Sequence, residues 1–137
     1  MFYLQQDSTV RPVRVEVSVR DTFLGRLTGA LVAGRIPFRR AYLFPGGGSV
    51  HTFFMRSSIS VLTFDESGRI LSYRPKIPPF RVCLTDRRSL GLLEMAPGRL
   101  EFPGGDPGRY SVKFTPEVAD RLGWTELSYS GPEGRRP

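Results

Sequence analysis

The chain contains a single histidine, His51, which follows a run of three glycines (46–48) in the sequence PGGGSVHTFFMR. An imidazole titrates near neutral pH and can bind a ligand or transfer a proton. A little further along the chain, the guanidinium of Arg56 can hold a carboxylate or a phosphate through two parallel hydrogen bonds. The glycines allow the backbone to approach a ligand closely. The candidate residues of this predicted polar site are Gly47, Gly48, His51, Thr52 and Arg56.

A carboxylate from a second stretch is a candidate for the same site. Glu94 lies within the apolar sequence LGLLEMA (90–96), where burying a carboxylate without a partner is costly. The arginines that could neutralise it are Arg26, Arg56 and Arg81. These residues predict either a ligand site or a buried ion pair, and Asp65 is a further candidate partner for Arg56. His51 likewise has two interpretations, as a ligand-binding residue or as a hydrogen-bonded residue of the core.

Catalysis is not favoured by the sequence, although a hydrolase that uses His51 is an alternative. Serines lie close to His51, but the nucleophile motif G-x-S-x-G is absent from the sequence. Cys83 is embedded in an apolar stretch, which is typical of an inert core thiol. One histidine and one cysteine are too few for a transition-metal site, which usually needs three or four nitrogen or sulfur ligands. We therefore expect neither a metal nor a cofactor.

The charge of the chain points to an anionic partner. The net charge is +7, carried by 18 arginines and 2 lysines against 13 acids, and residues 1–100 hold all of the excess. We expect a small anionic or polar ligand, such as a sugar acid, or an acidic segment of a partner protein. Nucleic-acid binding is an alternative, because aromatic residues lie close to arginines in PFRRAYLF (37–44) and SYRPKIPPFR (72–81). It is not favoured, since a GC-rich codon usage also enriches arginine over lysine.

Short alternating segments must position these residues. VRVEVSV (13–19) alternates valine with polar residues, as a half-buried strand does, and DESG (65–68) is typical of a tight turn between two strands. Helices are predicted over 21–34 and 115–123 from their caps and apolar spacing. The remaining predicted strands are 40–44, 50–55, 58–64, 69–75, 81–85, 90–95, 110–114 and 124–130. The fold class is thus mainly β with α+β character: a compact, barrel-like antiparallel or mixed sheet with one or two short helices.

The chain is expected to form one β domain over 1–98, followed by a proline- and glycine-rich segment over 99–137 with a short helix, a final strand and a frayed tail. The N-terminus lacks the basic and apolar regions of a signal peptide. Apolar runs are far shorter than the ~20 residues that span a membrane. We therefore expect a cytoplasmic protein without a membrane partner, and no feature specifies an oligomeric state.

Four sequence blocks in order resemble the family called domain of unknown function 192. They are R-x-x-G (26–29), FPGGGSVHTFFMRSSISVLTFDESGRIL (44–71), PPFRV (78–82) and LLEMAPG (92–98). The resemblance covers about residues 13–98 and implies a compact, mostly β, barrel-like domain without an established activity. Ser60 stands where relatives often have aspartate, and Gly48 where they often have cysteine. An activity that depends on that carboxylate or thiol is therefore in doubt for this chain.

These observations favour a non-enzymatic binding module. The predicted pocket lies where the glycine run, His51, Arg56 and the segment 78–81 meet. Its ligand is expected to be small and anionic or polar, or else an acidic segment of a partner.

Overall fold

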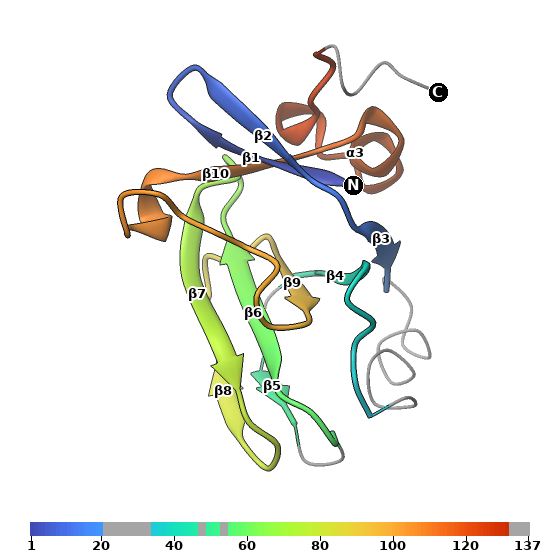
Figure 1. Cartoon of the computed structure of the whole chain (residues 1–137). Coiled ribbons are helices and arrows are strands. Elements are labelled where there is room, and N and C mark those ends of the chain that lie inside the picture. The colour runs from blue at the N-terminus through green and yellow to red at the C-terminus, as the bar shows by residue number, and fades with distance from the viewer. Residues whose placement is uncertain (21–33, 47–48, 53–54, 132–137) are drawn as a thin grey trace.

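The fold is mainly β, as predicted (Figure 1). The computed structural model describes residues 1–20, 34–46, 49–52 and 55–131, with Ser49 and His51 described by their backbone. The helices are η1 (Pro107–Arg109), α3 (Pro116–Leu122) and η2 (Thr125–Leu127). The strands are β1 (Phe2–Gln6), β2 (Thr9–Val13), β3 (Glu16–Val19), β4 (Arg40–Pro45), β5 (Ser49–His51), β6 (Ile59–Phe64), β7 (Ile70–Ile77), β8 (Val82–Leu84), β9 (Gly91–Met95) and β10 (Ser111–Phe114).

The described strands form three sheets, in the orders β10-β1-β2, β3-β4-β9-β6-β7 and β5-β8. All pairs are antiparallel except β3 with β4. The sheets do not close into a barrel, so that part of the expectation is corrected: the central strands of the large sheet are covered on both faces instead. All six residues of β6 are buried for this reason. No helix in the described part of the chain is long and apolar enough to cross a membrane.

Two apolar cores lie on opposite faces of the five-stranded sheet. The first core joins that sheet to the three-stranded sheet, through residues such as Phe2 and Phe114 on one side and Leu93 on the other. The second core lies between the opposite face and the β5–β8 ribbon, and it includes Val50 and Cys83. The burial of Cys83 agrees with the predicted core thiol. The ribbon is therefore fixed to the sheet by one face only.

The valine-rich stretch 13–19 forms two strands rather than one. β2 ends at Val13 in the three-stranded sheet, and β3 begins at Glu16 in the five-stranded sheet. Val13 and Val15 are both buried in the first core, and the amide of Val15 donates to the carbonyl of Val13 at 3.0 Å. The valines face the core, as the alternation predicts, while the chain passes from one sheet to the other between them.

The predicted turn at 65–68 and the short helix near the C-terminus are both present. The carboxylate of Asp65 accepts hydrogen bonds from the amides of Ser67 and Arg69, and it closes the β6–β7 hairpin. α3 begins after Thr115 and ends at Gly123, whose φ of 70° suits glycine. The predicted helix over 21–34 lies almost entirely outside the described residues.

The end of the described chain differs from the sequence expectation. The strand predicted over 124–130 is wrong: η2 occupies its centre, and Ser128 forms a single bridge to Phe114. Trp124 instead packs its ring edge-on against Phe64, at 5.6 Å between centroids. Burial of the indole against the core is what replaces strand pairing here. β10 from the same part of the chain pairs with β1.

Candidate functional site

The β5–β8 ribbon is held at one end by Thr52, which is fully buried. The Thr52 hydroxyl donates to the carbonyl of Pro78 at 2.7 Å and accepts from the amide of Arg81 at 3.0 Å. The Thr52 amide donates to the carbonyl of Arg81 at 2.9 Å, and the Thr52 carbonyl accepts from the amide of Phe80 at 3.0 Å. The segments 49–52 and 78–81 therefore meet, and Thr52 joins them through bonds that occupy its hydroxyl.

The other predicted site residues are only partly placed. His51 pairs in register with Val82, and its side chain lies outside the described atoms. Arg56 is exposed, and its amide donates to the carbonyl of Gly34 at 2.7 Å. Arg81 is exposed as well, and its guanidinium donates to the carbonyl of Phe80 at 3.2 Å. Arg26, Gly47 and Gly48 lie outside the described residues.

Glu94 lies at the centre of the five-stranded sheet, on β9 between Tyr42 of β4 and Val61 of β6. Alternation places it on the face of Leu92, which belongs to the second core. Among the described side chains it has neither an ion pair nor a hydrogen bond, so the expected pair with Arg56 or Arg81 is not formed. Desolvation by the surrounding protein raises the pKa of the Glu94 carboxyl to about 7.

A second unpaired group lies on the other side of Tyr42. The guanidinium of Arg20 stacks over the Tyr42 ring, with its central carbon 4.9 Å from the ring centroid. The Nε of Arg20 is buried and has no hydrogen-bond acceptor. The same sheet face thus presents an unpaired carboxyl and an unpaired cationic N–H, separated by one aromatic ring. Arg20 was not among the residues selected from the sequence, because nothing in its neighbours marks it as buried.

An exposed apolar row lies on β8 and was also missed by the sequence reasoning. Four large apolar side chains of the described chain are well exposed, and three of them lie within residues 80–84. Phe80 is 68% exposed, Val82 56% and Leu84 83%, while Cys83 between them is buried. We call these three residues the β8 row. Alternation within FRVCL was the available signal, but it does not tell which of its two faces meets the core.

β8 also has an open edge. In the part of the chain that the structure describes, β8 pairs only with β5. The amide of Thr52 bonds to the carbonyl of Arg81, and the register pairs Cys83 with Val50. Since bonded and non-bonded pairs alternate in an antiparallel ladder, the N–H and C=O groups of Val82 and Leu84 point away from β5. Figure 1 shows β7 running into β8 as one extended edge, at the end of the molecule away from α3.

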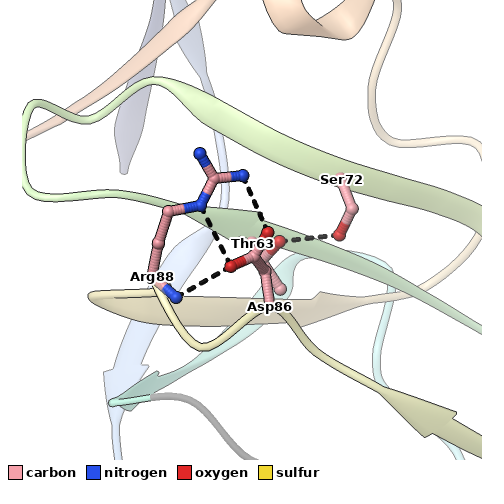
Figure 2. A network of polar contacts seen from close by, with 4 residues as sticks. All are labelled: Thr63, Ser72, Asp86 and Arg88. Atoms are coloured by element: carbon pink, nitrogen blue, oxygen red, sulfur yellow. Dashed lines mark hydrogen bonds and ion pairs between the residues drawn. The ribbon is translucent and has the colours of Figure 1, made fainter.

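The surroundings of the β8 row are cationic. Residues 74–88 carry five cationic side chains and one carboxylate, a net charge of +4. That carboxylate, Asp86, accepts from the guanidinium of Arg88 at 2.9 Å and from its amide at 2.8 Å (Figure 2). Hydrogen bonds from Arg88 lower the pKa of Asp86 to about 2. Asp86 thus stays ionised and paired, while Arg74, Lys76, Arg81 and Arg87 form no ion pair with another described residue.

Comparison with known proteins gives a family and a fold. The sequence model of the DUF192 family, whose description is "Uncharacterized ACR", matches residues 3–110 of this chain. A crystal structure of a protein of unknown function from Novosphingobium aromaticivorans is similar, with a TM-score of 0.65 at 13% identity over 82% of this chain and 83% of that one. A proposed transcription regulator from Sinorhizobium meliloti has a TM-score of 0.65 at 15% identity, over 82% and 90% of the two chains. No curated protein sequence matches the chain significantly.

Proposed function

The chain belongs to the DUF192 family of uncharacterised proteins, and from that premise we propose that it is a binding module for an acidic, extended segment of a partner protein. The segment adds to the open edge of β8 as a further strand. The observation that carries the proposal is the exposure of the β8 row, along and just before a strand that is paired on one side only within the described part of the chain. Large apolar side chains in a cluster on a surface are typical of an interaction site.

Main-chain bonds give such a complex its affinity, and side-chain contacts give it specificity. The outward N–H and C=O groups of Val82 and Leu84 bond to the main chain of the added segment. Apolar side chains of that segment cover the β8 row, and its carboxylates face the surrounding arginines. The net charge of +4 over residues 74–88 supports an acidic partner and disfavours a basic one.

The neighbouring edge supports the choice of β8. β7 presents Arg74, Pro75 and Lys76, all exposed, to its open side. Charged residues and proline on an edge strand are the usual protection against added strands. β8 combines an edge with apolar side chains and has no proline within its three residues. An incoming segment is therefore directed to β8.

The test uses a fluorescein-labelled peptide of alternating glutamate and valine, with a lysine–valine peptide of equal length as its counterpart. Fluorescence anisotropy at low salt is expected to detect saturable binding of the acidic peptide alone. Leu84→Ser should weaken binding roughly ten- to a hundredfold, the contribution of one buried leucine. The matched control is Phe38→Ser, which removes an apolar side chain that is 55% exposed and lies far along the chain from β8. Equal binding of both peptides, or equal effects of both variants, would contradict the proposal.

A second candidate function is favoured by Glu94 and by the Nε of Arg20 on the face of the second core, neither of which has a hydrogen-bond partner among the described residues. A small polar ligand with both donors and acceptors, such as a sugar acid, would satisfy both groups. Below pH 7 the neutral Glu94 carboxyl donates a hydrogen bond to a ligand carboxylate, whereas the ionised form repels it. Glucuronate binding, followed by saturation-transfer NMR, should therefore weaken between pH 6 and pH 8, and Glu94→Gln should remove that dependence. Binding that is independent of pH in the unmodified protein counts against this function.

A further inference from the structure

A second basic site lies on the opposite part of the fold, between β2 and the loop 98–101. A cavity of about 210 Å³ opens there, and its lining includes three arginines, Arg11, Arg14 and Arg99. Pockets for larger organic ligands have volumes of about 300 to 1,000 Å³. The size of this cavity therefore fits a small ion rather than an extended cofactor.

The guanidinium of Arg99 is fixed in place but incompletely bonded. Its Nη2 donates to the carbonyl of Arg14 at 2.6 Å, and its plane stacks on the Phe38 ring at 4.5 Å from the centroid. Its Nε is buried and has no acceptor. A buried cationic N–H without an acceptor is costly, and it is rare in folded proteins. Two contacts thus hold the guanidinium of Arg99 rigid, and it forms no ion pair with a described carboxylate.

Arg11 is held in a comparable way. Its Nη2 donates to the carbonyl of Glu101, so a neutral main-chain group rather than a carboxylate binds it. Neither Arg11 nor Arg99 takes part in the ion pairs Arg40–Glu16, Arg88–Asp86 and Arg109–Asp106 of the described residues. The carboxylate of Glu101 lines the cavity as well and forms no such pair. Two cations therefore line one cavity without forming an ion pair to a described carboxylate, although Glu101 lies in the same lining.

We propose that this cavity binds a small oxyanion, phosphate or carboxylate, between the guanidinium groups of Arg11 and Arg99. The oxyanion accepts hydrogen bonds from the outer N–H groups of the two guanidinium groups, and its charge is balanced by both arginines. The planar guanidinium group of arginine matches the spacing of the oxygen atoms in both carboxylate and phosphate. The site is independent of the β8 row, so either proposal can fail while the other stands.

The test is a titration of the ¹⁵N-labelled full chain with inorganic phosphate, with acetate and with chloride. The Nε–H resonance of Arg99 reports on anion binding at its guanidinium group. Phosphate or acetate should shift this resonance saturably, and the tighter of the two identifies the chemical class of the ligand. A shift of equal size with chloride, or a shift that never saturates, overturns the proposal, because either reflects general screening of charge.

Variants separate the site from the rest of the basic surface. Arg99→Gln and Arg11→Gln should each weaken oxyanion binding roughly ten- to a hundredfold, as expected for a charge-assisted bond. The matched control, Arg109→Gln, removes an exposed arginine elsewhere and should leave binding within about twofold. Glu101→Gln removes the competing carboxylate at an exposed position and should tighten binding about two- to fivefold. If Arg99→Gln fails to fold, the Glu101→Gln variant provides the test instead. Weaker or unchanged oxyanion binding by Glu101→Gln refutes the site.

Discussion

Replacing Glu94 by glutamine should stabilise the protein at alkaline pH and leave its stability unchanged in acid. The pKa of Glu94 is raised from its usual 4.5 to about 7 because the folded protein desolvates the carboxyl. A group whose pKa is raised by folding contributes its full stability below the unfolded pKa, here 4.5. That contribution is lost as the pH rises through the folded pKa, here about 7.

The magnitude follows from the size of the shift. The difference between 4.5 and about 7 corresponds to about 3 kcal/mol well above pH 7, at 1.36 kcal/mol per pKa unit. Because Glu94 keeps part of its exposure, solvent screening reduces this to roughly 1.5–3 kcal/mol. For a chain of 137 residues, this is a rise in Tm of about 5–10 °C. Glutamine has nearly the shape of the protonated side chain, so packing should be unchanged.

The assay is thermal unfolding by circular dichroism at pH 4.5, 6.5 and 8.5 for both proteins. The difference in Tm between variant and unmodified protein should be near zero at pH 4.5 and should grow with pH. Glu66→Gln, at an exposed position of the β6–β7 turn, serves as the matched control and should change Tm little at any pH. A Glu94→Gln difference that stays constant across the three pH values refutes the account of an unpaired, desolvated carboxyl.

Three further substitutions test the local structure, each by urea unfolding. Thr52→Val keeps the shape of the residue but leaves the main-chain groups that bond to its hydroxyl without a partner. It should lower the free energy of unfolding by about 1–3 kcal/mol, and a loss below about 0.5 kcal/mol would show that those bonds are dispensable. Phe80 is exposed and has a φ of 64°, a backbone conformation that asparagine adopts more readily than phenylalanine. Phe80→Asn should therefore raise the free energy of unfolding by up to ~1 kcal/mol while weakening peptide binding. A lower free energy of unfolding would mean that the ring packs in the free protein. Gly68→Ala places a Cβ 2.5 Å from the carbonyl oxygen of Val112 and should lower the free energy of unfolding by more than ~2 kcal/mol. Its control, Gly98→Ala, has a similar φ but lies in open space and should lower that free energy by about 1 kcal/mol. Equal losses in the two variants would refute the close contact.

The sequence predicts the local elements well where one physical rule decides them. Alternation of valines indicates which side of 13–19 faces the core, and the cap and glycine around α3 define its limits. The passage of that stretch between two sheets was not predictable, because Val13 and Val15 fill the same core whether or not the strand is broken. Local pattern carries no information on which sheet accepts a strand.

For the candidate site, too, the sequence indicated some features and not others. The segment 78–81 was expected to meet the glycine run, His51 and Arg56; Thr52, next to His51, bonds to Pro78 and Arg81, and the pocket itself stays a prediction. That Glu94 forms no ion pair with a described residue was not predictable, since the positions of arginines along the chain do not indicate which of them reach it. The exposure of the β8 row was not predictable either, because Val82 and Cys83 are both apolar. Only the packing of the β5–β8 ribbon against the large sheet decides that Cys83 is the buried one.

Amide hydrogen exchange of β8, measured by NMR with and without the glutamate–valine peptide, tests the proposed strand addition most directly. The account predicts that the N–H groups of Val82 and Leu84 become protected on binding, because they face the open edge. The N–H of Cys83, which faces β5, should change little. Binding of the peptide without new protection at Val82 and Leu84, or with equal protection at Cys83, would contradict the claim that β8 receives a partner strand.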